Sequence, residues 1–266
     1  MSRFSIARVG AICLRHFYVL RRSWSRLVEM AYWPTMSMVI WGFLSQFLAT
    51  NSSWVASAFG VILAAVMLWD VLFRGQLGFS LSFIEELWSR NLANLYCSPL
   101  TPLEHVLALV VMAFLRAIVG VLPAMLLAIP FYDYSIFSLG LPLLAFFLNL
   151  LIMGCGLGLV VTAFILRFGL AAENLAWFLV FLLAPFSAVY YPVTVLPPWA
   201  QSIAWFLPST HVFEGMRWIL FEHAFRWDHF LWAAGLNACF IPIGVGAYLF
   251  SFSSARRLGL LLQVGE

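Results

Sequence analysis

Two stretches of this chain, residues 139–166 and 229–252, are largely apolar and contain no charged side chain. Each exceeds the roughly 20 residues that a helix needs to cross the hydrocarbon core of a bilayer. Within that core every backbone N–H and C=O group must find an internal partner, so apolar runs of this length form membrane-spanning helices. The sequence therefore predicts an all-α, polytopic membrane protein.

The other apolar runs raise the predicted number of transmembrane helices to six. The 266 residues are 64% hydrophobic and 9% charged, whereas soluble domains have about 25% charged residues. This length leaves no room for a separate soluble domain, so residues 1–266 are predicted to form a single transmembrane domain. The predicted spans are residues 30–50, 54–73, 105–129, 139–166, 174–191 and 229–252.

All fourteen basic residues are arginine, and their distribution predicts the orientation of the chain. If the N-terminus is cytoplasmic, eleven arginines lie in inner segments and only Arg217 and Arg226 lie in outer ones. Because Arg-rich segments face the cytoplasm, both termini are predicted to be cytoplasmic. Without lysine the chain lacks the standard phosphate-binding loop, so any ATP hydrolysis belongs to another subunit. No charge run indicates nucleic-acid binding.

Residues 4–28 have the pattern of a helix that lies on the membrane surface. Arg8, Arg15, Arg22 and Arg26 share one side of a helical wheel. The residues on the opposite side are Ile6, Val9, Cys13, Phe17, Leu20, Trp24 and Leu27. This separation predicts an interfacial helix held by headgroup phosphates and buried apolar area. A soluble helix packed against a partner is the alternative.

A polar-leaning connection extends from residue 74 to residue 101, and its apolar residues recur every three or four positions. This spacing predicts a short cytoplasmic amphipathic helix over residues 81–97. The helix contacts a partner protein or lies on the membrane surface without one. Thr101, Pro102 and Glu104 then have the spacing of a capping box with proline at the first helical position, which predicts the start of the next span.

The stretch from Tyr190 to Arg217 cannot be a single span, because prolines interrupt it at positions 192, 197, 198 and 208. Proline removes a backbone donor and clashes with the preceding turn of a helix. We therefore predict an outer region, residues 192–228, of short re-entrant helices between spans five and six. An outer loop with aromatic anchors at the interface is the alternative.

Arg116 lies near the middle of the third predicted span. A charged residue inside the bilayer is costly, so we expect it to face protein or water and to serve a function. Two roles are open. Arg116 pairs with backbone carbonyls or with Asp70 at the end of the second span, or it contacts the substrate.

The outer stretch also resembles a known family. Residues 187–192 read Ser-Ala-Val-Tyr-Tyr-Pro, and Leu-Pro follows at 196–197. Residues 207–211 read Leu-Pro-Ser-Thr-His and are followed by Glu214 and Arg217. This order is similar to the signature region of type-2 ABC exporter permeases, and the resemblance extends over most of the chain. The family also has an amphipathic helix before its first span.

The resemblance implies a permease subunit of an ATP-driven exporter in a bacterial cytoplasmic membrane. It implies a homodimer with two ATP-binding subunits, which carry ATP and Mg, and a cargo that is amphiphilic, lipid-linked or a glycan. Residues 81–97 would then be a coupling helix that contacts the ATP-binding subunit through Glu85, Glu86, Trp88, Arg90, Asn91 and Leu92. The residues expected at the substrate path or gate are Arg116, Tyr190, Tyr191, Trp199, Trp205, Glu214 and Arg217.

An intramembrane enzyme that acts on a lipid or glycan is the alternative function. His211 with Glu214, and Glu222 with His223, bring an imidazole and a carboxylate within reach of each other. Neither pair has a third metal ligand at a sensible spacing, and nucleophile motifs are absent from the sequence. We therefore predict no catalytic, cofactor or metal site. A non-transporting membrane scaffold is a third possibility.

Overall fold

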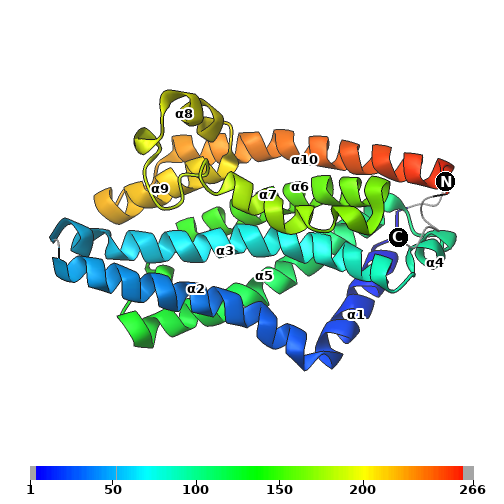
Figure 1. The fold of residues 1–266 in the computed structure, drawn as a ribbon, viewed down its shortest axis with the longest axis horizontal. Coiled ribbons are helices and arrows are strands. Elements are labelled where there is room, and N and C mark those ends of the chain that lie inside the picture. The colour runs from blue at the N-terminus through cyan, green and yellow to red at the C-terminus, as the bar shows by residue number, and fades with distance from the viewer. Residues whose placement is uncertain (1–3, 52, 260–266) are drawn as a thin grey trace.

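The computed structural model describes residues 4–51 and 53–259, and within these residues the chain forms helices and no β-strand. The long helices run side by side along the longest axis of the molecule (Figure 1). They are α2 (Trp24–Asn51), α3 (Ser53–Trp88), α5 (Pro102–Tyr132), α6 (Leu141–Phe168) and α10 (Trp227–Arg257). The all-α prediction is confirmed.

Four of the described helices are long and apolar enough to cross a membrane. These candidate spans cover residues 59–88, 102–132, 141–172 and 227–257. The predicted spans three and six lie within the second and the last of them, and the predicted span four, residues 139–166, overlaps the third. The chain is therefore a multi-pass membrane protein, and the count of six spans stays a prediction.

The second predicted span ends too early. α3 continues as one helix through Trp88, although we had expected a polar connection to begin at Arg74. The predicted helix over residues 81–97 is consequently divided between the end of α3 and the short α4 (Leu92–Cys97). Charged side chains do not end α3, because Arg74 and Glu86 are buried against neighbouring helices.

The fifth predicted span, residues 174–191, is also wrong as a continuous helix. Only α7 (Leu175–Leu183) is helical there. At about 1.5 Å per residue its nine residues span about 14 Å, less than half of the roughly 30 Å hydrocarbon core. The chain then turns through Pro185 and through Ala188, whose φ of 51° lies in the left-handed region.

The outer region forms short helices, as predicted, and two of them begin at prolines. After a 3-10 turn at Val193–Val195 come α8 (Pro198–Trp205) and α9 (Pro208–Glu222). Proline fits the first turn of a helix because the N–H it lacks would have no helical partner there. α9 packs against α3, α6 and α10. Whether these helices enter the bilayer stays a prediction.

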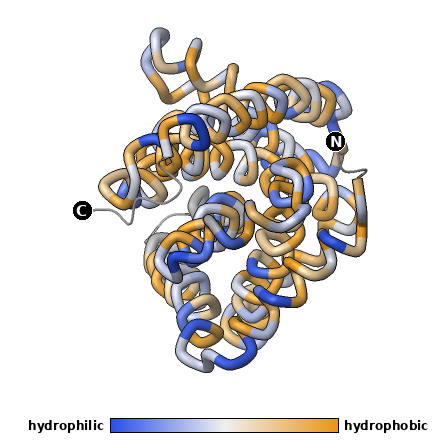
Figure 2. Tube along the Cα trace, turned by 90° about the vertical axis from the view of Figure 1, so that its right-hand side faces the viewer, coloured by the Kyte–Doolittle hydropathy of each residue, from blue (hydrophilic) through white to orange (hydrophobic). Residues whose placement is uncertain are grey.

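The two ends of the bundle carry different elements. α8 and α9 lie at one end, and α1 (Ile6–Arg22) and α4 lie at the other (Figure 1). We call the second end the Arg-rich end. α6 and α10 finish there with arginines at positions 167, 256 and 257, and Arg90 lies in the turn that follows α3. Figure 2 views the molecule from this end and shows hydrophilic segments (blue) among predominantly hydrophobic helices (orange).

α1 is shorter than predicted and turns two of its arginines toward protein. Residues 24–28 of the predicted interfacial helix belong to α2. Arg8 and Arg15 pair with carboxylates of α5 and α3, so these two arginines do not depend on headgroup phosphates. Ile6 and Phe17 are exposed. Val9 and Leu20 of the same predicted face are buried, so this face lies only partly open to lipid. The interfacial position of α1 stays a prediction.

Glycines let α6 approach its neighbours at backbone distance. A Cβ atom added to Gly154 would lie 2.6 Å from the Leu72 carbonyl oxygen of α3. One added to Gly244 of α10 would lie 3.0 Å from the carbonyl oxygen of Gly156. Small residues allow this contact between membrane helices. α6 is thereby held between α3 and α10.

Candidate partner surface and outer gate

A charge cluster joins α1, α2, α3 and α5 near the Arg-rich end. Glu85 Oε1 accepts from Arg26 at 2.9 Å, and its Oε2 accepts from Arg116 at 2.8 Å. Glu86 pairs with Arg15 and accepts a hydrogen bond from Asn91 Nδ2 at 2.9 Å. His16 lies between the carboxylates, 3.4 Å from Glu86 and 3.9 Å from Glu85. The cluster comprises Arg15, His16, Arg26, Glu85, Glu86 and Arg116.

This arrangement changes the interpretation of Glu85 and Glu86. We had placed them at the exposed tip of a coupling helix, but the Glu86 side chain is only 2% exposed and Glu85 is largely buried. A carboxylate that leaves water needs a close counter-ion, and both residues have one. Glu85 and Glu86 therefore support the end of α3 from within the bundle.

Arg116 has a different partner from the one we considered. Its side chain is 7% exposed and pairs with Glu85, not with Asp70. α5 has 31 residues, about 46 Å at 1.5 Å per residue, and so exceeds a core of about 30 Å. The position of a residue along this helix therefore does not fix its depth in the bilayer. The ion pair with Glu85 therefore favours the structural role of Arg116.

The predicted capping box at the start of α5 is present. The Glu104 N–H donates to Thr101 Oγ1 at 3.3 Å, and Glu104 Oε2 accepts from the Thr101 N–H at 2.8 Å. The same carboxylate accepts from Arg8 Nη2 at 2.6 Å and from the Ser5 N–H at 2.7 Å. The cap therefore also fastens the beginning of α1.

The turn from α3 to α4 is the exposed part of the predicted contact segment. Trp88 is 50% exposed, and its Nε1 donates to Glu173 Oε2 at 3.3 Å. Arg90 is exposed and has a φ of 54°, which reverses the chain. Leu92 is buried, and Asn91 holds Glu86. Of the six predicted contact residues, Trp88 and Arg90 are the two that face solvent.

At the other end, Arg217 fastens α9 to the chain that follows α7. Its Nη2 donates to the carbonyl oxygens of Ala188 and, at 2.9 Å, Val189. Its Nη1 donates to Glu214 Oε1 at 3.1 Å, and that oxygen also accepts from the Val193 N–H at 2.8 Å. Burial lowers the pKa of Arg217, while Glu214 acts in the opposite direction. We call these five residues the outer clamp.

The predicted aromatic gate residues surround the outer clamp. Tyr190 stacks on Trp41 of α2 with ring centroids 4.6 Å apart. Tyr191 Oη donates to the Pro185 carbonyl at 2.7 Å. Trp199 is exposed, and the Trp205 carbonyl is 3.0 Å from His211 Nε2. These residues share one region, but Arg116 lies elsewhere, in the charge cluster.

Sequence reasoning missed His16, Trp41 and the asparagine pair formed by Asn149 and Asn237. Asn237 Nδ2 donates to the carbonyl oxygen of Asn149 at 3.0 Å and to its Oδ1 at 3.1 Å. One signal was available: a polar amide inside an apolar span needs a hydrogen-bond partner, and each of these two spans carries one. No comparable pattern marks Trp41, which is one of twelve tryptophans.

Of the two imidazole and carboxylate pairs considered for catalysis, the first has other partners, and the second, Glu222 with His223, is exposed. His211 contacts the Trp205 carbonyl, and Glu214 accepts from Val193 and Arg217. Among the described residues, no three metal-binding side chains gather at one place. The geometry therefore gives no specific support to the enzyme alternative.

Comparison with known proteins identifies the family. The model of the ABC-2 type transporter family matches residues 10–221. This range contains α2 to α8, the charge cluster and the outer clamp, and it covers most of the 266 residues. No curated protein matches the chain. The chain belongs to the ABC-2 type transporter family and is a permease subunit of an ABC transporter.

Proposed function

We propose that two copies of this permease, driven by two ATP-binding subunits, export an amphiphilic, lipid-linked or glycan cargo across a bacterial cytoplasmic membrane. The family implies the ATP-binding partner. The observation that carries the proposal is the exposed turn at Trp88 and Arg90, because charged contacts fix its base to three other helices.

The proposed contact with the ATP-binding subunit is centred on Trp88 and Arg90. A large aromatic side chain and an arginine beside it are residue types enriched at protein interfaces. Glu85 and Glu86 carry motion of the turn to α1, α2 and α5 through the charge cluster, with Asn91 and Leu92 as internal supports. This path can couple the ATP-binding subunit to the bundle only if it includes an element with two conformations, and if both sites shift the equilibrium between them. The end of α3 is our candidate for that element.

The Arg-rich end is proposed to face the cytoplasm. The exposed arginines at positions 90, 167, 256 and 257 gather there, and cytoplasmic loops carry an excess of arginine and lysine. The first described residues of α1 and the last of α10 belong to this end. Both termini are therefore proposed to be cytoplasmic.

Site-specific crosslinking tests this proposal. In a variant without the four native cysteines, Arg90→Cys should crosslink to an ATP-binding subunit and react with a thiol reagent only after the membrane is opened. Ser202→Cys on α8 is the matched control, because it is exposed at the opposite end. It should react in intact cells and give no such crosslink. Labelling of Arg90→Cys from outside would refute both the orientation and the contact.

We further propose that residues 190–217 gate the outer end of the path. The outer clamp joins this segment into one unit, and the stacking of Tyr190 on Trp41 gives it a contact with α2. Because the hydrogen bonds of the outer clamp lie within this segment and the residues just before it, the segment can move as one body and keep them. The alternative is a static plug that shapes the outer mouth.

A reversible crosslink separates these alternatives. A disulfide between two copies of the permease at position 199 should leave ATP binding intact and stop export, and reduction should restore export. Wild-type protein treated with the same oxidant is the control. Full export with the crosslink complete would leave the static plug as the correct interpretation.

A further inference from the structure

A groove of about 260 Å³ lies between α6 and α10 near the Arg-rich end. Residues of α6 between positions 160 and 168 form one wall, and residues of α10 between positions 247 and 251 form the other. The walls include Phe164, Phe168 and Phe250, which are all exposed. Both helices are candidate membrane spans, so the groove opens toward lipid.

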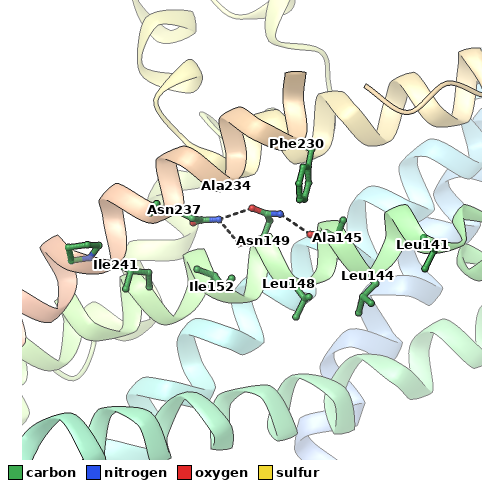
Figure 3. A pocket seen from close by; sticks show the side chains of 12 residues that line it. Leu141, Leu144, Ala145, Leu148, Asn149, Ile152, Phe230, Ala234, Asn237 and Ile241 are labelled. Carbon is green, nitrogen blue, oxygen red and sulfur yellow. Dashed lines mark hydrogen bonds between the residues drawn. The ribbon is translucent and has the colours of Figure 1, made fainter. Parts of the chain in front are cut away.

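The two helices that form the groove keep one register along their length. Figure 3 shows Asn149 and Asn237, which are 88 positions apart, pointing toward one another. The same separation recurs where a Cβ atom added to Gly244 would lie 3.0 Å from the carbonyl oxygen of Gly156. Both helices rise by about 1.5 Å per residue and run in the same direction. Residues of α6 and α10 that are 88 positions apart are therefore level with one another.

Three arginines lie at one end of the groove. Arg167 lines it, and the register places this residue level with Ala255, directly before Arg256 and Arg257. All three arginines are exposed, and none forms an ion pair with another residue that the structure describes. The Arg167 guanidinium lies 5.8 Å from the centre of the Phe168 ring, a contact that uses none of its N–H groups. Within the described chain this positive charge therefore has no counter-ion.

The groove thus combines a cation at its end with apolar walls. Arg167 and Ser251 are the only polar side chains among the described lining residues. An arginine at the end of a membrane helix extends to the level of the lipid headgroups, because its charge is costly deeper in the bilayer. Headgroup phosphates lie at that level, and a guanidinium binds phosphate oxygens through paired N–H groups.

The volume of the groove favours a chain over a compact ligand. It is smaller than the roughly 300–1,000 Å³ of common small-molecule cavities. A segment of one acyl chain can lie along such a narrow space and leave its headgroup outside. A phospholipid carries both a phosphate and an acyl chain, so it matches both parts of the groove.

We propose that this groove binds one anionic phospholipid from the leaflet at the Arg-rich end. The phosphate accepts hydrogen bonds from Arg167, and Arg256 and Arg257 add positive charge beside it. One acyl chain lies against Phe164 and Phe250. A zwitterionic lipid binds less well, because its own ammonium group is repelled by the same arginines. The proposal concerns lipid binding alone, so it stands or falls independently of export.

Photolabelling tests the proposal with two phospholipids that have identical acyl chains and the same photoreactive group on one chain. One probe is a phosphatidylglycerol, and the other is a phosphatidylcholine. With the full-length protein in phosphatidylcholine nanodiscs, the phosphatidylglycerol probe should label residues 160–168 and 247–251. In competition it should be preferred at least about fivefold, the effect of one arginine near a membrane surface.

Two variants separate the cation from the apolar walls. Arg167→Gln should lower the preference about fivefold and keep labelling by the phosphatidylcholine probe. Arg90→Gln is its control, because Arg90 is exposed at the same end but does not line the groove, and it should keep the preference. Ala247→Phe fills the groove and should reduce labelling by both probes. Ile243→Phe, at an exposed position of the same helix outside the groove, should not.

Four results would overturn the proposal. Equal labelling by both probes in the wild type would mean that Arg167 only extends into water. Equal losses of preference in Arg167→Gln and Arg90→Gln would mean that the general charge of this end attracts the lipid. Absence of label on both walls would mean that the groove is not a lipid site. Loss of the preference in inorganic phosphate, at constant ionic strength, would mean that the arginines bind a soluble anion.

Discussion

The charge cluster and the outer clamp both bury arginines, but they connect very different parts of the chain. In the cluster, the paired residues are 71, 59 and 31 positions apart, and they belong to four helices. In the outer clamp, Arg217 reaches carbonyls 28 and 29 positions away and a glutamate in its own helix. The charge cluster thus holds four helices of the bundle together, whereas the outer clamp joins α9 to the nearby residues that follow α7.

The acceptors differ as well. Arg116 faces a carboxylate, so loss of either partner leaves a charge in a buried place. Arg217 combines one carboxylate with two backbone carbonyls, which keep part of its hydrogen bonding if Glu214 is changed. Removing one member of a buried ion pair is more costly than losing single hydrogen bonds. The Arg-rich end should therefore be the more sensitive to substitution.

The largest effect is expected for Glu85→Gln. It leaves Arg116 buried without its counter-ion, which should lower the free energy of unfolding by about 3–5 kcal/mol. Chemical unfolding in mixed micelles would measure the loss. Glu222→Gln, at an exposed position of α9, is the control and should leave stability unchanged.

A double-mutant cycle sharpens this prediction. If Glu85 and Arg116 act mainly on each other, Glu85→Gln combined with Arg116→Gln should be less destabilising than the sum of the single changes. If the two single effects add up strictly, Glu85 and Arg116 do not stabilise each other, and the effect of Glu85 on stability would come from its contacts with Arg26 and His16. Normal insertion but lost transport by Arg116→Leu would add a functional role to the ion pair.

The beginning of α5 shows what the sequence could predict. Thr101, Pro102 and Glu104 are neighbours, and each signal in the capping box acts within three residues, so the start of the helix was predicted correctly. Long apolar runs identify α6 and α10 for the same reason, because span length depends only on the local sequence. The prolines predicted the breaks in the outer region, and α8 and α9 begin at two of them, Pro198 and Pro208.

The course of α3 could not be predicted in the same way. Local reasoning ended the span near Arg74, since an unpaired charge does not stay in the bilayer. Glu85 and Glu86 stay inside the bundle because Arg15, Arg26 and Arg116 come from other helices, and the sequence does not state that they meet. The sequence also could not show that Trp88 is exposed while Glu86 and Leu92 beside it are buried, because their burial depends on the same contacts between helices.

A smaller loss of stability is expected for Glu214→Gln in the outer clamp. This substitution removes the counter-ion of Arg217 but leaves the hydrogen bonds from Arg217 to the Ala188 and Val189 carbonyls. A hydrogen bond to a charged group contributes about 1.5–3 kcal/mol, and this range is the expected loss. Limited proteolysis should cut residues 188–193 sooner, and a protease-resistant variant would show that the clamp does not hold this segment.

Thr101→Ala should have a still smaller effect at the Arg-rich end. It removes the side-chain acceptor for the Glu104 N–H, and loss of such a cap costs about 1 kcal/mol. Thr101→Ser keeps the hydroxyl oxygen and should retain most of the stability. If both variants lose the same amount, the methyl group rather than the cap supports α5.

The smallest effect is expected for Asp228→Asn, whose ion pair lies at the end opposite the charge cluster. Asp228 and Arg226 are 2.5 Å apart, but their side chains are 48% and 40% exposed. Water screens such a pair, so exposed ion pairs contribute little to stability. Arg226 also keeps its contact with the Trp218 ring, 4.7 Å from the centroid. The unfolding temperature should therefore not change measurably at any salt concentration. A clear decrease would mean that another molecule, such as the second permease copy, covers this pair in the assembled transporter, and the outer end would then depend on buried charges as the Arg-rich end does.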